Sequence, residues 1–445
     1  MADAKLRGPS TLPISISFGC RMKKSIEIPN PQQSFERDHL LQESKVFCMA
    51  PWVQMDINWN AAKPCCWSNN VNWNLKQREI NKFWNGPELR RLRNDMLAGK
   101  KNPICRGCYA TEANACRSLR QQMNEEYAGY FCRVEASVDG KAKHPPAVLN
   151  IALSNLCNFR CRMCGPWASS AWNEDAQKIF GTAWVNAALT LEWRRVLEPF
   201  LPYLDRLHFA GGEPLLEPQH YELLRFLIDR GGPRPSITYN TNFSVMSRGG
   251  DDVMTLWNEF KSVGVAASLD GMGKRGEYIR KGQRWDQVIQ NRERMLKVCP
   301  RVHFMISPTI SLMNALHLPD FHREWLVRGY IDIETGLGTS AILLSRPQFY
   351  SVQVLPPALK RQVEGKYREH AYWISSSYGA RAKAVLRYYQ TIIDSMMARD
   401  ESSRLYEFRR WTALLDIVRR EMFEQTFPEL ASLMEGGLEA PPQTS

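Results

Sequence analysis

The sequence predicts an α/β fold in which parallel strands and helices alternate to form a curved, incomplete barrel. Three observations support this prediction. Strand-like and helix-like runs alternate from about residue 147 to about residue 337, distinctive cysteine and polar motifs follow the strand-like runs, and a cysteine-free helical segment comes last. Alternation of this kind produces parallel sheets with right-handed crossovers. We therefore expect functional residues at the carboxyl ends of the strands.

The predicted strands are short apolar or alternating runs bounded by turn residues. They cover residues 147–155, 206–210, 236–242, 264–270 and 302–311, with 332–337 as a candidate sixth strand. The predicted helices have apolar residues at helical spacing and cover 167–202, 220–230, 252–263, 285–298 and 317–328. Six strand–helix units of this kind correspond to a partial barrel.

The chain divides into five segments by composition. A polar start at 1–44 and a tail at 436–445 have the composition of loosely held ends. A cysteine-rich segment at 45–132 precedes the strand–helix segment at 146–345. Residues 346–435 are predicted to be helical, and their aromatic and methionine residues at helical spacing are interpreted as core.

The composition indicates a soluble globular protein. Hydrophobic residues make up 44% and charged residues 23% of the 445 residues, and no run approaches the roughly 20 apolar residues of a membrane span. The first residues lack the succession typical of a secretory signal, so we expect a cytoplasmic protein with no membrane partner. In a reducing compartment, clustered members of the twelve cysteines are expected to hold metal or do chemistry.

The formal net charge is +12, from 58 Lys and Arg against 46 Asp and Glu. This charge permits an anionic partner such as RNA, an acidic peptide or a phosphorylated substrate. The basic residues are scattered, however, and groups such as Arg419 and Arg420 lie on predicted helices, where they are interpreted as solvated faces. A nucleic-acid partner is therefore considered but not favoured.

Three cysteines, Cys157, Cys161 and Cys164, lie in the stretch SNLCNFRCRMCG directly after the first predicted strand. A compact loop with this spacing can direct all three thiols to one point. A structural zinc ion would require a fourth thiolate or a histidine, and no histidine lies within forty residues downstream. Three thiolates on a cubane iron–sulfur cluster instead leave one iron open for another ligand.

The segment CNFRCRMC resembles the CxxxCxxC motif of the radical S-adenosylmethionine (SAM) superfamily, and Met163 stands where that family places an apolar side chain against the adenine. The resemblance implies a partial (β/α)6 TIM-like barrel and a 4Fe–4S cluster whose open iron binds SAM. An electron from the cluster would cleave SAM to methionine and a 5'-deoxyadenosyl radical, which removes a hydrogen atom from the substrate.

Further positions match SAM-binding motifs of this superfamily. The stretch from Gly211 through Gly212 and Glu213 to Pro214 resembles the GGEP motif, whose bare backbone and carboxylate meet the SAM ammonium group. The other matches, implied to contact the SAM ribose or carboxylate, are polar strand ends and one arginine: Asn240, Asn242, Ser268, Asp270 and Arg280. Each of these also has a structural interpretation, as a polar strand end or, for the arginine, as a surface salt bridge.

The cysteine-rich segment resembles the auxiliary-cluster domain called SPASM, or twitch in its one-cluster form. The matching stretches are FCMAPW, PCCW and a WNGPELRRLRNDMLAG helix that leads into CRGC. The resemblance implies one fully ligated auxiliary 4Fe–4S cluster on Cys48, one of Cys65 and Cys66, Cys105 and Cys108. Here the domain precedes the barrel, as in twitch-domain-containing radical SAM proteins. A zinc ribbon on the same thiols is the alternative, and Cys116 and Cys132 are additional candidate ligands or hydrogen donors.

These motifs together predict a radical SAM enzyme, most simply an oxidoreductase, that acts on a peptide side chain or a small polar metabolite by dehydrogenation, epimerisation or crosslinking. A closed auxiliary cluster fits an oxidation, because it can take an electron from the substrate radical. A flavodoxin- or ferredoxin-like protein is the expected electron donor. The alternatives are an RNA-modifying radical SAM enzyme and a non-catalytic iron–sulfur electron carrier. Intact SAM motifs argue against the carrier.

Overall fold

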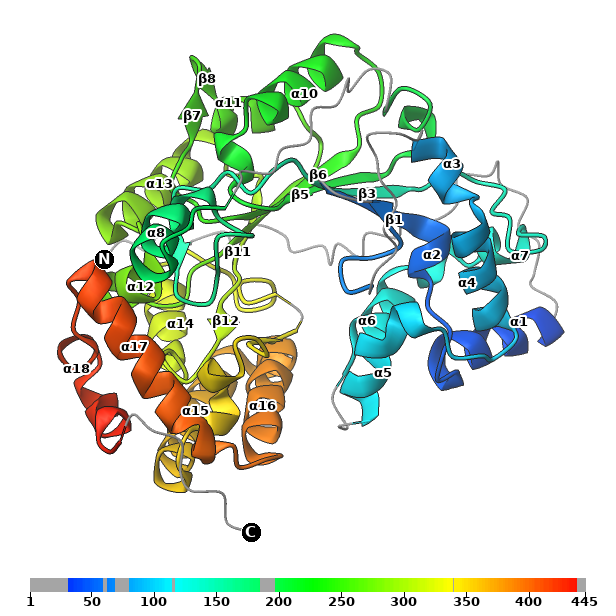
Figure 1. The fold of residues 1–445 in the computed structure, drawn as a ribbon. Helices are drawn as coiled ribbons and strands as arrows, with labels where there is room; N and C mark the ends of the chain where they lie inside the picture. The colour runs from blue at the N-terminus through cyan, green and yellow to red at the C-terminus, as the bar shows by residue number, and fades with distance from the viewer. Residues whose placement is uncertain are drawn as a thin grey trace, which may run out of the picture. The chain divides into compact units, whose positions relative to one another are not determined.

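The computed structural model describes residues 31–58, 62–68, 80–113, 117–184, 197–338 and 340–437 (Figure 1). The chain separates into two units. The described residues of the first unit lie in 31–53, 67–68 and 84–145, and those of the second unit lie in 54–66, 80–83 and 146–437. The predicted auxiliary segment 45–132 therefore contributes residues to both units.

The second unit is built on a seven-stranded sheet with the strand order β11-β9-β6-β5-β3-β1-β2. Neighbouring strands are parallel, except for the antiparallel pair β1 and β2. The strand bounds are Gln54–Asn58 (β1), Ala62–Lys63 (β2), Val148–Ala152 (β3), Arg206–Ala210 (β5), Ser236–Thr241 (β6), Val263–Ala267 (β9) and His303–Ile306 (β11). The predicted α/β fold with a parallel sheet is confirmed.

One face of this sheet forms the core of the unit. Alternate strand residues such as Ile151, Phe209 and Tyr239 are at most 1% exposed, as the two-residue period of a strand requires. Four helices cover this face: α10 (Pro218–Asp229), α11 (Val253–Trp257), α13 (Trp285–Val298) and α14 (Leu318–Val327). His220 of α10 meets Phe209 edge-on at 4.9 Å between ring centroids, and Trp257 of α11 packs on Tyr239 at 5.4 Å.

The sequence predicted several of these elements closely. The strand at 206–210 and the helix at 285–298 have the expected bounds. The expected helix at 252–263 ends earlier, at Trp257, because the chain continues in three-residue turns that start with Asn258 N donating to Thr255 O. Of the helix expected at 167–202, α8 covers Asn173–Phe180, and residues 185–196 lie outside the described residues.

The candidate sixth strand at 332–337 is wrong. These residues form turns, because Asp332 accepts a hydrogen bond from Glu334 N through its side chain and from Gly336 N through its carbonyl. Local bonds of this kind compete with strand pairing. The expected strand at 302–311 is also interrupted at Pro308, which has no backbone N–H to donate, and it separates into β11 and a short β12.

Short elements complete the second unit around the sheet. They are β4 (Arg160–Cys161), β7 (Ser247–Arg248), β8 (Asp251–Asp252), α12 (Gly273–Ile279), β10 (Arg280–Lys281), β12 (Thr309–Ile310) and β13 (Ile342–Leu343). β4 pairs with β10, β7 with β8, and β12 with β13. The β4–β10 pair joins the cysteine motif to the end of α12.

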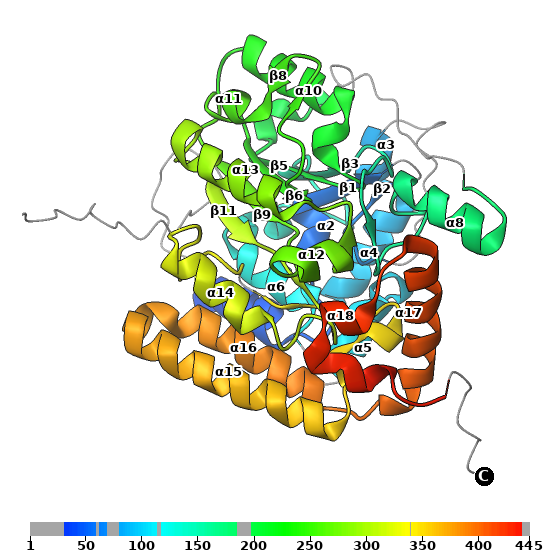
Figure 2. The same ribbon diagram turned by 90° about the vertical axis from the view of Figure 1, so that its left-hand side faces the viewer.

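The C-terminal part of the second unit is helical, as the sequence predicts. Its helices are α15 (Pro357–Tyr378), α16 (Lys383–Met397), α17 (Leu405–Arg419) and α18 (Phe423–Thr426). In Figure 2, α15 and α16 lie side by side below α14, and Tyr367 meets Tyr389 edge-on at 5.0 Å between their ring centroids. Several aromatic residues of these helices are core residues, as expected, since Tyr367 and Tyr389 are at most 1% exposed, but Tyr372 of α15 is 77% exposed.

The first unit is a small helical body. Its helices are α1 (Pro31–Asp38), α2 (Ala50–Val53), α4 (Pro87–Leu97), α5 (Arg106–Ala113), α6 (Leu119–Glu126) and α7 (Cys132–Glu135), and α3 (Ile80–Trp84) overlaps its start at Trp84. Arg93 of α4 is fully buried and donates to three carbonyl groups, those of Pro51, Gly140 and Trp84, at 2.9 Å each. This arginine ties α4 to three separate backbone segments of the unit.

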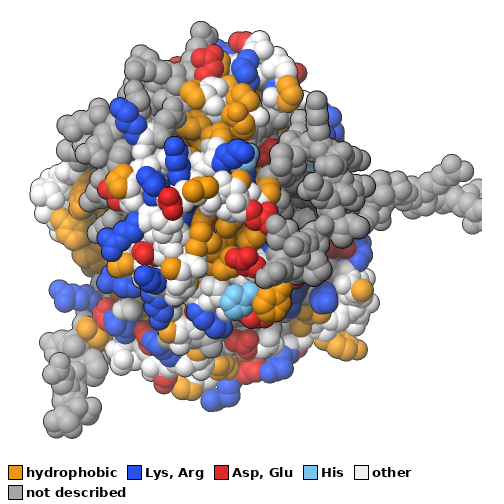
Figure 3. Space-filling model, turned by 90° about the vertical axis from the view of Figure 1, so that its right-hand side faces the viewer, with side chains coloured by type: hydrophobic (Ala, Val, Ile, Leu, Met, Phe, Trp, Pro, Cys, Tyr) orange, Lys and Arg blue, Asp and Glu red, His pale blue; other side chains and the backbone are white. Residues whose placement is uncertain are grey.

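The described surface carries mixed charges. The face drawn in Figure 3 shows Lys and Arg side chains interspersed with Asp, Glu and apolar side chains. Some exposed side chains of opposite charge form ion pairs, as Arg381 and Asp332 do at 2.9 Å. None of the described helices combines the length and the apolar character that a membrane crossing requires.

Candidate active site

The three motif cysteines lie on the loop that follows β3. Cys161 is buried, and Cys157 and Cys164 are partly buried. Cys161 lies in β4, opposite Arg280 of β10, and Cys164 N donates to Cys161 O at 3.0 Å to close a tight turn. Ser170 fixes the start of the loop, because its Oγ accepts from Cys157 N at 3.1 Å. The structure thus brings the three predicted thiols together on one braced loop.

The thiols have unequal electrostatic surroundings. The Cys164 thiol, which hydrogen-bonds Cys161, and then the Arg280 guanidinium hold the pKa of Cys161 below its usual value. Arg280 Nη1 is 3.8 Å from Cys161 Sγ. Burial raises the pKa of Cys157 to about 12. Removing protons from all three thiols therefore requires a cationic partner in the loop, and an iron–sulfur cluster supplies one.

Arg280 is in turn held by Asp270. Its Nε lies 2.7 Å from Asp270 Oδ2, and its Nη2 donates to Asp270 Oδ1 at 3.0 Å. Thr309 N donates to the same Oδ1 atom at 2.8 Å. Both side chains are largely buried, so this is a buried ion pair beside a cysteine and not the surface salt bridge that was the alternative for Arg280.

The stretch Gly211–Pro214 follows β5 and lies against the cysteine loop. Gly212 N donates to Ser154 O at 3.1 Å, and Glu213 N donates to Leu156 O at 2.7 Å. Gly211 has φ of +113°, and a Cβ on Gly212 would overlap the Leu156 carbonyl. Only glycine allows the two backbones to approach this closely.

Glu213 is 1% exposed, and its carboxylate accepts three hydrogen bonds. The donors are Asn242 N at 2.6 Å, Thr241 Oγ1 at 2.7 Å and Leu215 N at 3.1 Å. Among the described residues, no Lys or Arg forms an ion pair with it, and burial raises the pKa of Glu213 to about 7. The site therefore contains a buried carboxylate whose charge a bound cation would stabilise.

The remaining predicted residues surround the same strand ends. Asn242 Nδ2 lies 4.0 Å from Cys157 Sγ and donates to Asn158 Oδ1 at 2.8 Å. Asn240 is exposed in β6, and Ser268 N donates to Thr241 O just after β9. Met163 is partly buried between two of the cysteines, and Pro214 begins a short 3₁₀ turn.

A buried arginine inside the cysteine motif was missed by the sequence-based reasoning. Arg162 is fully buried, and its Nη2 lies 2.5 Å from Asp416 and 2.7 Å from Glu421, near the end of α17. Its guanidinium carbon lies 3.5 Å from the centroid of the Tyr278 ring. Both carboxylates are more than 250 positions away in the sequence, so their pairing with Arg162 was not predictable. The only indication in the sequence was an arginine inside the cysteine motif, which would need an acidic partner if it were buried.

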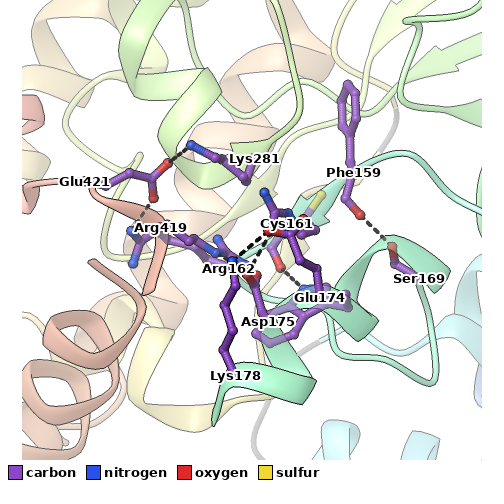
Figure 4. Close-up of polar contacts among 12 residues, drawn as sticks. Phe159, Cys161, Arg162, Ser169, Glu174, Asp175, Lys178, Lys281, Arg419 and Glu421 are labelled. Atoms are coloured by element: carbon purple, nitrogen blue, oxygen red, sulfur yellow. Dashed lines mark hydrogen bonds and ion pairs between the residues drawn. The ribbon is translucent and has the colours of Figure 1, made fainter. Parts of the chain in front are cut away.

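A second buried arginine corrects the prediction of a solvated face for Arg419, whereas Arg420 is exposed, as predicted. The Arg419 side chain is fully buried, and its Nη2 lies 2.8 Å from Asp175 of α8. Asp175 also binds Arg160 of the cysteine loop at 2.9 Å. Figure 4 shows Arg162, Asp175 and Arg419 near Cys161. The C-terminal helices thus hold the cysteine loop through two ion-pair groups.

Three of the predicted auxiliary cysteines come together in the first unit. Cys48, Cys105 and Cys108 interact electrostatically, and burial raises the pKa of Cys105 to about 12 and that of Cys48 further. The positive charge of Arg120 acts in the opposite direction and lowers the pKa of both Cys48 and Cys105. The Arg120 side chain is 4% exposed, and its Nη2 lies 2.7 Å from Glu112 Oε2. Buried thiols beside an arginine suit a group that binds thiolates.

The other N-terminal cysteines lie elsewhere. Cys65 and Cys66 belong to the second unit, where they follow β2, the first partly buried and the second exposed. Cys132 begins α7 and is disulfide-bonded, so the suggestion that it is a cluster ligand or hydrogen donor is wrong, because it has no free thiol. Cys116 lies outside the described residues. No three His, Cys, Asp or Glu side chains among the described residues surround a single metal-ion position. The thiolate ligands of a cubane bind different irons and stand farther apart than the ligands of one ion.

Residues 151–310 match the family model of the radical SAM superfamily. The chain therefore contains a radical SAM domain, and all three motif cysteines, the GGEP stretch and the Asp270–Arg280 pair lie within it. A domain of this superfamily implies an enzyme that uses SAM and a 4Fe–4S cluster. The residues present fit both groups, because one buried thiol and two partly buried thiols share one loop and a buried carboxylate lies beside it.

Solved structures with a similar arrangement include anSMEcpe with bound AdoMet and Cp18Cys peptide, at 16% identity and a TM-score of 0.37 over 53% of this chain and 61% of that chain. Streptococcus suis SuiB bound to the precursor peptide SuiA matches at 16% identity and a TM-score of 0.34, over 59% of this chain and 53% of that chain. The chain thus spans about three fifths of the anSMEcpe chain. No curated protein matches the sequence.

Proposed function

We propose that this protein is a radical SAM enzyme that cleaves SAM reductively and removes a hydrogen atom from a peptide side chain or a small polar metabolite. The observation that carries the proposal is the Glu213 carboxylate, buried without an ion-pair partner among the described residues and bonded through its own backbone to the cysteine loop. A carboxylate in this position suits the ammonium group of SAM.

In this proposal, Cys157, Cys161 and Cys164 are the cluster ligands. When bound, the cluster supplies the electron for SAM cleavage and an open iron at which SAM binds. Arg280 stabilises the thiolate of Cys161, and Asp270 fixes the direction of that guanidinium.

Most of the proposed SAM-binding residues lie at the ends of β5, β6 and β9, while Met163 lies in the cysteine loop and Arg280 in β10. The Glu213 carboxylate accepts from the ammonium group, and Gly211 and Gly212 allow the backbone to approach. The other proposed contacts are Met163 and Pro214 as apolar surface and Asn240, Asn242, Ser268, Asp270 and Arg280 as polar groups. Asn242 is already oriented, since its Oδ1 accepts from Ser244 N at 3.0 Å.

The auxiliary site is proposed on Cys48, Cys105 and Cys108, with Cys65 or Cys66 as the fourth ligand from the sequence resemblance. A cluster with four thiolates has no open iron, so its role is electron transfer or shaping of the substrate site. This favours net oxidation of the substrate, with a flavodoxin- or ferredoxin-like protein as the donor of the initiating electron.

Anaerobic reconstitution with iron and sulfide, followed by reduction and assay for 5'-deoxyadenosine, tests the proposal. We expect the wild type and Cys299→Ala to cleave SAM, because Cys299 is a buried thiol at the end of α13, outside both cysteine groups. Cys157→Ala should abolish cleavage. SAM cleavage by Cys157→Ala, or its absence in the wild type, would show that the proposal is wrong.

The same preparations test the auxiliary site by iron content. Two cubane clusters correspond to about eight irons per chain, and one to about four. Cys105→Ala is expected to lower the count from about eight to about four, while Cys299→Ala leaves it unchanged. An unchanged count in Cys105→Ala would refute the auxiliary assignment without affecting the SAM site.

A further inference from the structure

The sheet of the second unit has a second face, opposite the one that α10, α11, α13 and α14 cover. On this face, Asn150, Ala152 and the alternate residues of β5, β6, β9 and β11 are partly buried or exposed, whereas Gln54 and Val148 are buried. In Figure 1, α10 and α11 lie on one side of strands β5 and β6, which leaves this second face turned away from them. The proposed SAM-binding residues lie at the carboxyl edge of the same sheet.

One line of residues crosses this face. Asp56, Asn150, His208, Thr238 and Gly264 are successive cross-strand neighbours on β1, β3, β5, β6 and β9. Asn150 Nδ2 donates to Asp56 Oδ1 at 3.0 Å, and His208 Nδ1 lies 2.9 Å from Thr238 Oγ1. With parallel strands about 4.8 Å apart, the line from Asp56 to Thr238 extends about 14 Å. We call these residues the polar row.

The next row towards the carboxyl edge is mostly small. Ala152, Ala210, Asn240 and Ala266 lie two residues beyond the polar row on β3, β5, β6 and β9. Three of these side chains end at Cβ, so little side-chain bulk separates the polar row from the proposed SAM-binding edge. A substrate lying over the alanines would have the polar row within hydrogen-bonding reach.

Asp56 is the acidic residue of the polar row, and the side chains that donate hydrogen bonds to its carboxylate carry no positive charge. Its carboxylate accepts from two neutral amides, Asn150 Nδ2 and Gln54 Nε2, the second at 3.2 Å. Lys63 is its ladder neighbour on β2, yet no Lys or Arg of the described ranges forms an ion pair with Asp56. Burial raises the pKa of Asp56 to about 7, against the lowering effect of Asn150 and Lys63.

We propose that Asp56 is a substrate-binding carboxylate that accepts hydrogen bonds from an amine group of the substrate, held as an ammonium. An ammonium supplies the positive charge that the two amide partners lack, and hydrogen bonds between ionised groups are the strong ones in partly desolvated sites. The proposal rests on the proposed function, because it places the substrate on the second face of the sheet in a radical SAM domain.

The competing explanation is that Asp56 only ties β1 to β3. Two substitutions separate these roles. Asp56→Asn keeps the shape and hydrogen-bonding capacity of the tie and removes the charge, whereas Asn150→Ala removes the tie and keeps the charge. Asp332→Asn serves as the matched control, because Asp332 is exposed and pairs with Arg381 among turns remote in sequence from the polar row.

The measurement is the affinity of two small probes for the reconstituted full-length protein with SAM bound and no reductant. The probes are N-acetyl-lysine methylamide and N-acetyl-norleucine methylamide, which differ at the amine. We expect the wild type, Asn150→Ala and Asp332→Asn to bind the lysine probe at least about tenfold more tightly. Asp56→Asn should bind both probes equally.

Two results would overturn the inference: equal or undetectable binding of both probes by the wild type, or a preference for the lysine probe that survives in Asp56→Asn. Circular dichroism of each variant checks that the fold is intact. Failure of the proposed function is distinguishable, because it appears as absence of 5'-deoxyadenosine from the reduced wild type, whichever probe binds.

Discussion

At the scale of single residues, Glu213 combines three hydrogen bonds with a raised pKa. The bonds come from Asn242 N, Thr241 Oγ1 and Leu215 N, and they lower the pKa, but burial outweighs them and raises it to about 7. The protein therefore holds an acceptor whose ionised form is costly while it has no cation. Binding an ammonium group would lower that pKa and use the preformed geometry.

We predict that SAM affinity of the reconstituted protein depends on Glu213 ionisation. Below pH 7 the carboxyl group of the free protein is protonated, so the dissociation constant should rise about tenfold from pH 8 to pH 6. Glu213→Gln should weaken SAM binding by about 10- to 100-fold at pH 8 and remove this pH dependence. Equilibrium dialysis with labelled SAM measures both effects.

The control for this experiment is Glu334→Gln, which alters an exposed carboxylate that pairs with Arg381. It should leave the affinity and its pH dependence as in the wild type. If Glu213→Gln retains a tenfold change between pH 6 and pH 8, another group titrates and Glu213 does not meet the ammonium.

At the scale of elements, α17 acts as a brace for the cysteine loop. Arg162 contacts Asp416 and Glu421, while Arg419 contacts Asp175, which also holds Arg160. Since the buried guanidinium groups lose their hydration, these ion pairs contribute only when both partners are present. The loop therefore depends on a helix that joins it only in the folded chain.

Asp416→Asn tests this brace. Glu421 remains to pair with Arg162, so we expect the free energy of unfolding to fall by about 1–3 kcal/mol, as for a lost hydrogen bond to a charged group. Glu429→Gln, which breaks the partly exposed pair with Arg275, should cost less than about 1 kcal/mol. Urea unfolding followed by circular dichroism compares the two, and equal losses would show that α17 does not brace the loop.

At the scale of the whole molecule, the net charge of +12 has to be weighed against its distribution. Arginines such as Arg162 and Arg419 are buried against carboxylates and present no charge to a partner. The exposed ones include Arg328 and Arg381, which pair with neighbouring acids. These four arginines are therefore compensated by carboxylates of the same chain.

We predict weak, non-specific RNA binding. A mixed-sequence single-stranded RNA should lose most of its affinity between 50 mM and 200 mM salt, because few phosphates are contacted and the interaction is counterion-driven. The RNA should not increase 5'-deoxyadenosine formation above the level without substrate. Fluorescence anisotropy and the SAM-cleavage assay measure these quantities. Tight binding at 200 mM salt with stimulation would instead favour an RNA-modifying enzyme.

Local patterns made much of the second unit predictable. Strand Arg206–Ala210 and helix Trp285–Val298 follow from periodicity, and the Glu213 stretch follows from its place after a strand. Contacts between distant segments were not predictable, because nothing near Arg162 in the sequence encodes Asp416. The sequence predicts a strand at 332–337 because polar and apolar residues alternate there. In the structure, the Asp332 side chain instead accepts a hydrogen bond from Glu334 N, which favours a turn.

Strand β1 has a consequence for how this protein can be divided and made. It comes from before the cysteine motif, yet all five of its residues pair with β3 in parallel register, from Gln54–Val148 to Asn58–Ala152. A fragment that begins at residue 146 would leave β3 as a bare sheet edge, and an edge of this kind recruits other chains. During synthesis, almost ninety residues are made after β1 before the partner strand β3 follows. Separating the cysteine-rich segment from the radical SAM domain would therefore remove a strand from the described sheet.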